Sequence, residues 1–164
     1  MKKLILNSVT LAFMLVLFVS CSSDNESNPS SSNEVVKSYT HSTAELELLD
    51  QVNNYRVSIG LNPLNIIDHI SYKSAEHNDY MYANHVVTHD GFDKRKSNLQ
   101  EVLGAYRVGE NIAYGYSSAS STVSAWINSP SHKANLEGDY THFGGAIKID
   151  EEGKKYYTNI FIKK

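Results

Sequence analysis

The sequence predicts an α+β fold in which helices stack on a small, mostly antiparallel sheet. Apolar residues recur at helical spacing through the first half of the folded region. Residues 142–164 instead alternate and are rich in β-branched and aromatic side chains, which is typical of a hairpin turning at Glu152 and Gly153. No strand–helix–strand rhythm is present, so we expect helices first and strands last, with the helices packed on the sheet.

The first twenty residues have the pattern of a signal peptide. Lys2 and Lys3 form a charged start, and the apolar run over residues 11–19 is too short for a membrane-spanning helix. The run ends in FVSC, which resembles the lipobox of bacterial lipoproteins and contains the only cysteine, Cys21. We therefore expect residues 1–20 to be a lipoprotein signal peptide and Cys21 to be lipidated. The alternative is an ordinary cleaved signal followed by an unpaired cysteine.

Residues 21–41 are rich in Ser and Asn and almost free of large apolar side chains. Such a segment cannot bury enough apolar surface to offset the entropy of ordering, so we expect a disordered tether after the lipidated cysteine. His41 then lies outside the folded domain. Residues 42–164 remain, which is enough for one domain.

Net charge limits the kinds of partner. The formal charge of −3 becomes −5 when Lys2 and Lys3 leave with the signal peptide. No dense basic patch is present, so we expect no nucleic-acid partner. The expected partner is a lipid membrane, reached through the N-terminal acyl anchor. Ser22 after the cysteine permits sorting to the outer membrane or cell surface, so we expect an exported protein anchored there.

Two helices are expected in the first half of the folded region. Ser42 and Glu45 have the spacing of a capping box, and Gly60 ends the apolar pattern that follows. Asp68 can cap a second helix. The inward face of that helix should carry residues separated by four, seven and eleven positions: Ile70, Ser74, His77 and Met81.

The middle of the chain is less regular. Residues 85–109 show no long periodic run and are expected to form a loop with a turn at Asp90 and Gly91. The stretch GENIAYGY looks like a short strand entering a loop. The stretch SSASSTVSAWIN is expected to form a third helix, capped by a serine, that presents Val123 and either Trp126 or Ile127 inward.

The stretch WINSPSHKANL predicts a fourth, short helix. Ser129 is a good N-cap and Pro130 fits the first helical position. His132 then lies at the positive end of the helix dipole, where a charged imidazolium is disfavoured. We therefore expect a neutral ring near pH 7, which can bind a metal, accept a proton or form a hydrogen bond. The alternative is that His132 only helps to cap its own helix.

Three of the seven histidines lie at junctions between expected elements, where sites often form. They are His89 in THDG, His132 in SPSH and His142 in THFGG. Glu110 joins them because GEN places a carboxylate at a loop-to-strand transition. Imidazoles with one carboxylate suit Zn²⁺, and a His–Glu pair equally suits general acid–base chemistry.

The other histidines have simpler interpretations. His69 is expected in solvent on the first turn of the second helix. His77 is expected to be a core histidine, and His85 a partner for a helix dipole. No GxSxG motif and no free cysteine are present, so covalent hydrolysis is not supported.

Four motifs in a fixed order resemble one known family. THDG, GENIAYGY, W-x-x-SPSHKANL and THFGGAI resemble the CAP superfamily of cysteine-rich secretory, antigen-five and pathogenesis-related proteins. The likeness is greatest to its compact bacterial branch of SCP-like lipoproteins and covers about Glu45 to Ile162. The resemblance implies that residues 42–164 form a three-layer α-β-α sandwich. It also implies a cleft lined by histidines and glutamates that binds a divalent metal in some members.

The resemblance assigns His89, Glu110, His132 and His142 to the cleft. His89 matches the histidine ahead of GEN, and Glu110 matches its glutamate. Ser129 stands where eukaryotic members have a second glutamate, so a eukaryote-like tetrad is not expected. His89, Glu110 and His132 are then the candidate ligands for zinc or another divalent cation, and they must be near neighbours in space.

Three functions remain open. The resemblance favours a lipid-anchored binding module whose cleft holds a small apolar ligand, lipid or peptide, because family members bind sterols and other lipids. The second function is a metal-assisted, peptidase-like hydrolase in which zinc activates a water. The third is an adhesive surface module with a vestigial cleft. We expect binding more than catalysis.

Overall fold

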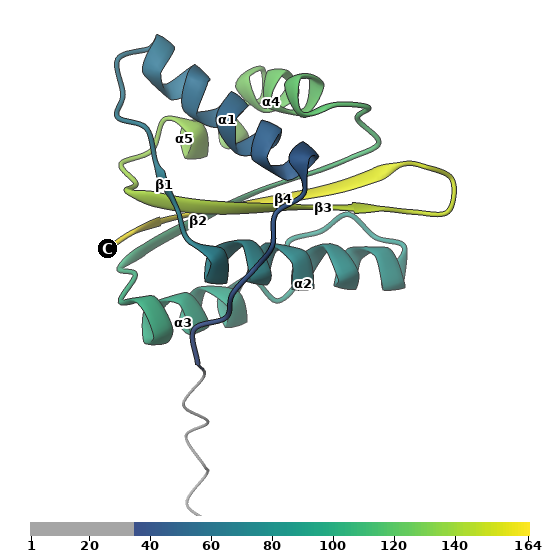
Figure 1. The fold of residues 1–164 in the computed structure, drawn as a ribbon, viewed down its shortest axis with the longest axis horizontal. Coiled ribbons are helices and arrows are strands. Elements are labelled where there is room, and N and C mark those ends of the chain that lie inside the picture. Colours follow the sequence, from purple (N-terminus) through teal and green to yellow (C-terminus); the bar gives the residue numbers. More distant parts are fainter. Residues whose placement is uncertain (1–34) are drawn as a thin grey trace, which may run out of the picture. The chain divides into compact units, whose positions relative to one another are not determined.

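The protein, described here from a computed structural model over residues 35–164, is a four-stranded sheet between two layers of helices (Figure 1). This confirms the predicted α+β fold and its three-layer arrangement. The predicted signal peptide, Cys21 and the tether up to residue 34 lie outside the described residues. No helix within residues 35–164 has the length and apolar character needed to cross a membrane.

The elements follow one another along the described chain in an order that mixes helices and strands. They are α1 (Thr43–Ser58), β1 (Asn65–Ile66), α2 (Asp68–Asn84), α3 (Phe92–Leu103), β2 (Arg107–Tyr114), α4 (Ala119–Ile127), α5 (Pro130–Leu136), β3 (His142–Ile149) and β4 (Lys155–Lys163).

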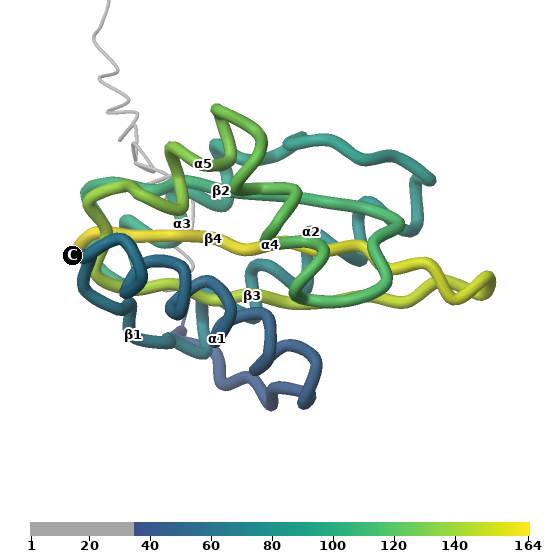
Figure 2. Tube along the Cα trace, turned by 90° about the horizontal axis from the view of Figure 1, so that it is seen from above, coloured from purple at the N-terminus to yellow at the C-terminus, as the bar shows by residue number. Residues whose placement is uncertain are grey.

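The strands lie in the order β1-β3-β4-β2. β4 pairs antiparallel with both β3 and β2, and only the short β1 is parallel to its neighbour, so the sheet is mostly antiparallel as predicted. α1, α4 and α5 cover one face, and α2 and α3 cover the other (Figure 1). From above, α1 lies over the β3 side and α5 over the β2 side (Figure 2). Because β2 pairs only with β4 in the described sheet, it is an edge strand.

The first helix begins as predicted. Ser42 and Glu45 form a complete capping box, and Gly60 follows the helix with φ of +82°. Glu45 also accepts a hydrogen bond from the backbone N–H of Ile147, which fixes the start of α1 on β3. At its other end, the buried Arg56 donates to the carbonyls of Leu136 and Gly138 and so holds α5 in place.

The main apolar core lies between the sheet and the layer formed by α1, α4 and α5 (Figure 1). Trp126 of α4 is buried there, as predicted, with Val123. A capping box between Ser118 and Ser121 starts α4, so the predicted serine cap is confirmed. Thirteen buried residues form this cluster: Leu48, Leu49, Val52, Leu64, Ala113, Ala119, Val123, Trp126, Leu136, Tyr140, Phe143, Tyr157 and Phe161.

The second helix confirms its predicted face but not its predicted cap. Ile70, Ser74, His77 and Met81 are all buried. Asp68 is the first helical residue, and Ile67 holds the N-cap position without a side-chain hydrogen bond, so the predicted Asp68 cap was wrong.

Polar contacts hold α2 on the sheet. The Ser74 hydroxyl donates to the carbonyl of Gly144 at 3.0 Å, and the Asn78 amide donates to the carbonyl of Ala146 at 2.8 Å. A Cβ on Gly144 would lie 2.4 Å from the backbone nitrogen of Ser71, so only glycine permits this close approach.

The region that we expected to be a loop contains a helix. α3 spans Phe92–Leu103, flanked by Gly91 and Gly104, both with φ of +71°. Only Asn98 and Leu99 of this helix are buried, so its apolar stripe is too narrow to give a periodic signal. β1 and β2 also fall between helices, so the expected separation of helices from strands holds only for the final hairpin.

Two histidines are placed differently from their predictions. His69 is 1% exposed, not in solvent, because its Nδ1 accepts from the backbone N–H of Lys37 and its Nε2 lies 2.8 Å from Asn98 Oδ1. His41, which we assigned to the tether, lies against α2 with its Nε2 2.7 Å from the Ser71 hydroxyl. The described end of the expected tether therefore packs on the domain.

Candidate functional site

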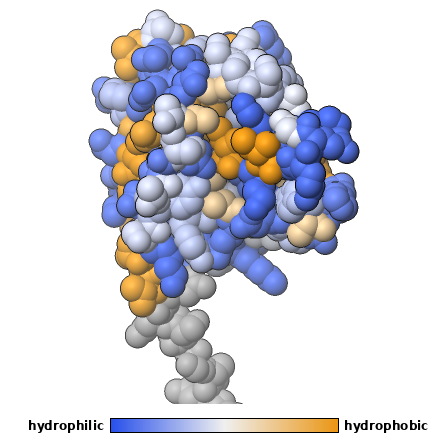
Figure 3. Space-filling model, turned by 45° about the vertical axis from the view of Figure 1, so that its right-hand side comes forward, coloured by the Kyte–Doolittle hydropathy of each residue, from blue (hydrophilic) through white to orange (hydrophobic). Residues whose placement is uncertain are grey.

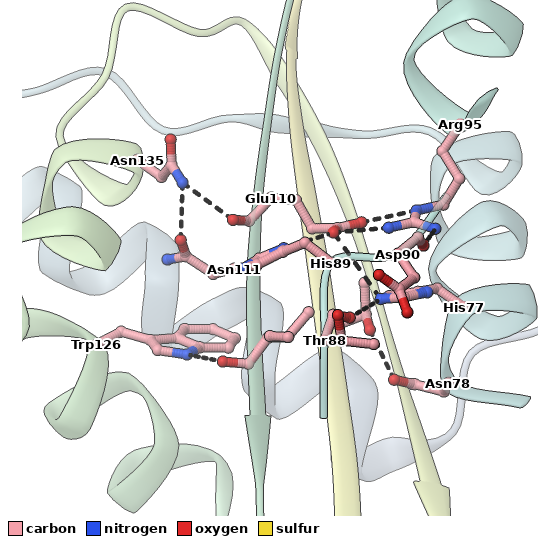
Figure 4. Close-up of polar contacts among 12 residues, drawn as sticks. His77, Asn78, Thr88, His89, Asp90, Arg95, Glu110, Asn111, Trp126 and Asn135 are labelled. Carbon is pink, nitrogen blue, oxygen red and sulfur yellow. Dashed lines mark hydrogen bonds and ion pairs between the residues drawn. The ribbon is translucent and has the colours of Figure 1, made fainter. Parts of the chain in front are cut away.

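Glu110 is the centre of the candidate site. It lies in the middle of β2, faces α2 and is 5% exposed. His89, from the loop before α3, donates its Nδ1–H to Oε1 of Glu110 at 2.8 Å. Arg95 of α3 donates from Nε to Oε2 at 2.8 Å and from Nη2 to Oε1 at 2.7 Å (Figure 4). The predicted neighbours His89 and Glu110 are thus in direct contact.

Opposing effects set the charge of the Glu110 carboxyl. Burial raises its pKa, but the hydrogen bonds from His89 and Arg95 and the positive charge of Arg95 together lower it more. The pKa of Glu110 therefore lies below its ordinary value, and the group is a carboxylate at neutral pH.

His77 of α2 is the third side chain near the Glu110 carboxylate. Its Nε2–H donates to the carbonyl of Thr88 at 2.8 Å and lies 3.9 Å from Oε1 of Glu110. Burial lowers the pKa of His77; the charge of Glu110 opposes this with a smaller effect and the charge of Arg95 adds to it, so the ring is neutral near pH 7. The predicted core position of His77 is confirmed, but sequence reasoning missed its contact with the acid.

Arg95 was also missed. Its only signal in the sequence is its position six residues after His89 in HDGFDKR. Had that stretch been identified as a helix, Arg95 and Asn98 would have been placed on one face, three residues apart. Without that helix, nothing in the sequence directed Arg95 toward Glu110.

His132 lies on the other side of β2. Ser129 is the N-cap of α5 and Pro130 its first residue, as predicted, but the Ser129 hydroxyl is 2.8 Å from His132 Nδ1 and does not bond the helix backbone. Burial, followed by the charge of His89, lowers the pKa of His132. The expected neutral ring is therefore supported, with burial as the main cause.

Side chains from α4 and α5 cover the edge of β2. The Asn135 amide donates to the Glu110 carbonyl at 3.0 Å, and the Trp126 indole N–H donates to the Ile112 carbonyl at 3.0 Å. The Asn111 amide donates to the carbonyl of His132 at 3.0 Å. These bonds fix α5 beside the strand and satisfy carbonyls that an edge strand otherwise leaves open.

Two cavities follow this edge. One, of about 290 Å³, is lined by His89, Phe92, Val108, Gly109, Glu110 and Asn135. The next, of about 330 Å³, has mostly apolar walls, which include Val87 and Trp126, and one imidazole, that of His132. We call the two cavities together the β2 cleft. His89 lines the first and His132 the second, so the cleft contains both rings.

His142 does not join this group. It begins β3, and β4 lies between β3 and β2 in the sheet. Its ring nitrogen Nδ1 bonds the hydroxyl of its neighbour Thr141 at 2.9 Å. The structure therefore brings three of the four predicted residues to the β2 cleft and leaves His142 two strands away from Glu110.

The donor set does not fit a divalent cation in this arrangement. Both oxygens of Glu110 already accept from the guanidinium of Arg95, and a cation on that carboxylate would lie next to a fixed positive charge. In both His89 and His132, Nδ1 forms a hydrogen bond, so only Nε2 of each ring could bind a metal. Within residues 35–164, no group of three His, Cys, Asp or Glu side chains has the spacing of a metal site.

Comparisons with known proteins agree with the fold. The model of the family described as CAP, the cysteine-rich secretory protein family, matches residues 49–161. The chain is 36% identical over 126 residues to the uncharacterized membrane protein YlbC of Bacillus subtilis. That match covers 74% of this chain and 35% of the relative, so the chain spans about a third of the relative's length.

Solved structures also resemble the chain. An extracellular SCP-domain protein from Bacillus anthracis has a TM-score of 0.64 and 26% identity, over 74% of this chain and 40% of that one. An outer surface protein from Borrelia burgdorferi has a TM-score of 0.65 and 24% identity, over 76% of this chain and 96% of that one. The second likeness concerns the fold alone.

Proposed function

The chain belongs to the cysteine-rich secretory protein (CAP) family, and from that membership we propose that it is an exported, lipid-anchored binding module. Its β2 cleft would hold a small apolar ligand. The observation that carries this proposal is the cavity of about 330 Å³ beside His132, which is walled mainly by apolar side chains. Such a cavity with few polar groups is typical of small-molecule sites.

The size and surroundings of the cleft favour a small ligand. Its exposed apolar residues include Val87, 48% exposed, and Tyr116, 39% exposed. Figure 3 shows another face of the molecule, where apolar residues also form small areas among hydrophilic ones, and the exposed apolar surface of the cleft is confined to a few side chains in the same way. A confined apolar area supports capture of an acyl chain or one apolar side chain more than docking of a large protein.

The strand edge argues against an extended peptide. The carbonyls of Glu110 and Ile112 already accept from Asn135 and Trp126. A peptide that added a strand to β2 would have to break these bonds. We therefore favour a ligand that inserts an apolar tail beside Trp126 and places its polar end near the Nε2 atoms of His132 and His89.

The binding test uses a dansyl-labelled medium-chain fatty acid and the purified full chain. Ala125 lines the cavity from α4, so Ala125→Phe should fill it and weaken binding at least about tenfold. Val87→Ser should weaken binding about fivefold through lost apolar contact. The matched control is Val57→Ser, an exposed valine on α1 outside the cleft, which should bind as the wild type. Equal affinity of all three variants would contradict the proposal.

One observation favours a second function, hydrolysis. His89 donates Nδ1–H to a buried carboxylate while its side chain is 50% exposed, which leaves Nε2 open to solvent as a general base. Turnover of a fluorescent peptide mixture that His89→Ala abolishes would support this function. A zinc titration distinguishes metal-assisted hydrolysis from a metal-free binding cleft. Binding of one zinc per chain that is lost in His89→Ala would contradict the metal-free cleft.

The proposed anchor rests on the FVSC motif and on the relatives. One similar protein is named a membrane protein, and one similar structure is that of an extracellular protein, which supports export. Mass spectrometry of the mature chain should find a diacylglyceryl or acyl group on Cys21. Cys21→Ser should release the protein from membranes. Membrane retention of the unlipidated variant would contradict the anchor but not the binding proposal.

A further inference from the structure

A second pocket lies between α2 and α3, outside the β2 cleft. It has a volume of about 480 Å³. Its walls include His77 and Tyr80 of α2, Arg95 and Asn98 of α3, and Asp90 from the loop between the helices. We call it the α2–α3 pocket. His77 and Arg95 separate it from the Glu110 carboxylate, since both contact that group from the helix side.

Two buried polar atoms on this wall have no protein partner. They are Nδ1 of His77 and Nδ2 of Asn98, in side chains that are 1% and 8% exposed. A buried polar atom without a partner costs roughly 1–3 kcal/mol, so such atoms need an explanation. Both residues line the same pocket, which indicates that something in the pocket satisfies them.

The hydrogen-bond network fixes what each atom offers. Nδ1 of His69 accepts from the backbone N–H of Lys37, so the proton of that ring is on Nε2 and donates to Oδ1 of Asn98. The Asn98 amide therefore cannot be flipped, and Nδ2 faces away from His69 as a donor.

The same logic applies to His77. Its Nε2 lies 2.8 Å from the carbonyl of Thr88, which can only accept, so Nε2 carries the proton. Nδ1 of the neutral ring is then an acceptor. In Figure 4 this second ring nitrogen lies on the side away from Glu110. The residues that line the pocket thus carry one buried acceptor without a partner on α2 and one buried donor without a partner on α3.

The remaining walls favour a neutral, hydroxyl-rich ligand. Lys73 pairs with Glu76 at 2.9 Å, and Arg95 is engaged by Glu110. The other two charged residues of the lining, Lys94 and Asp90, have opposite signs, so the charges largely cancel. Tyr80 bonds Asp90 across the rim and contributes an aromatic ring. None of the lining residues has an aliphatic apolar side chain, so an acyl chain or apolar peptide side chain would find no matching wall.

We propose that the α2–α3 pocket binds one sugar unit, with one hydroxyl donating to His77 Nδ1 and another accepting from Asn98 Nδ2. A hydroxyl both donates and accepts, so neighbouring sugar hydroxyls can satisfy both atoms at once. This site is separate from the β2 cleft and does not depend on the function proposed for the cleft.

The test is an NMR titration of the purified full chain in a detergent without a sugar head group. The probes are methyl α-glucoside and methyl α-galactoside, with cyclohexanol as a ring of similar size that lacks neighbouring hydroxyls. At least one sugar should shift the Asn98 side-chain NH₂ signal and the His77 ring nitrogen signals, and cyclohexanol should not. If neither sugar shifts these signals in the wild type, the proposal is wrong and water alone satisfies the two atoms.

Two conservative variants sharpen the test. His77→Phe retains a ring but removes the pocket acceptor, and Asn98→Asp retains the acceptor for His69 but removes the donor. Each should weaken sugar binding at least about tenfold, because a buried hydrogen bond is lost. Asn128→Asp, the same change outside both sites, should bind normally. Unchanged affinity in both pocket variants would overturn the proposal, and the wild-type titration decides even if a variant fails to fold.

Discussion

The two faces of the sheet are packed by different kinds of contact. The face under α1, α4 and α5 buries thirteen residues in one apolar cluster, whereas the face under α2 and α3 has two smaller clusters of five and three. On that second face, buried polar side chains bond the sheet directly, as Ser74 and Asn78 do with β3. Glu110 and His77 are buried there too.

This difference indicates that one face of the sheet contributes mainly apolar burial, whereas the other positions polar side chains. Apolar burial is not directional, and the first face, which buries the larger apolar cluster, serves as the core. On the second face, Gly144 lets α2 approach the sheet closely, and hydrogen bonds with defined geometry join the two. That combination holds a buried carboxylate, an arginine and two imidazoles in defined positions, which is what a site requires.

The largest expected effect tests the apolar face. Phe161 is fully buried in the main cluster, with its ring 5.5 Å from that of Tyr140. Phe161→Ala should lower the free energy of unfolding by about 3–5 kcal/mol, measured by urea denaturation. Ser74→Ala, which removes one hydrogen bond on the opposite face, should cost only about 1 kcal/mol. Equal losses would remove the distinction between the faces.

The next effect concerns the buried ion pair. Arg95→Met should destabilise the protein by about 3 kcal/mol, because it leaves the Glu110 carboxylate buried without its cation. The double variant Arg95→Met/Glu110→Leu should recover most of that loss, because no charge is left buried. Denaturation of the two variants in parallel measures both values. A double variant as unstable as the single one would show that Arg95 acts mainly through packing.

A third prediction tests the close approach of α2. A Cβ on Gly144 would lie 2.4 Å from the backbone of Ser71 and 2.7 Å from its hydroxyl. Gly144→Ala should therefore force α2 away from β3 and cost about 1–3 kcal/mol. Gly153→Ala is not a clean control because φ there is +77°. Ala146→Gly, which adds no atoms on the same face of β3, is suitable and should leave the contact with Ser71 intact.

Acid should weaken the polar face. Burial lowers the pKa of His77 below 6.5, so the unfolded chain binds a proton there at a pH where the folded chain does not. Stability therefore falls as pH drops below 6.5. The pKa of Glu110 is also lowered, so its contribution is present above its ordinary value of 4.5 and is lost as pH falls through the lowered value. Melting temperatures should show both declines, and His77→Gln should reduce the first; the remainder comes from His132 and His142, whose pKa values burial also lowers.

The smallest effect concerns an exception on the apolar face. Asn159 is fully buried there, and neither its Oδ1 nor its Nδ2 has a protein partner. Asn159→Leu should change the unfolding free energy by less than about 1 kcal/mol or raise it, since no hydrogen bond to protein is lost. The control is Asn78→Leu, which loses its bonds to Ala146 and Thr158 and should cost about 1–3 kcal/mol. A larger loss at Asn159 would indicate a water that the amide holds in the core.

Local patterns in the sequence determined most of the fold. The capping box at Ser42, the serine cap of α4, the Ser-Pro start of α5 and the final hairpin were predicted from neighbours within a few residues. The order of the motifs also identified His89 and Glu110, which the structure places 2.8 Å apart. These features follow from the sequence because each depends on short spacing or on a motif.

Only the tertiary structure decided the polar interior. His69 is buried because it bonds Lys37 and Asn98, which are 32 and 29 residues away. Arg95 is a site residue only because α3 brings it to a strand 15 residues later. A polar side chain is buried where distant partners satisfy it, and periodicity records which side of an element is apolar but not which partner a buried polar group will meet.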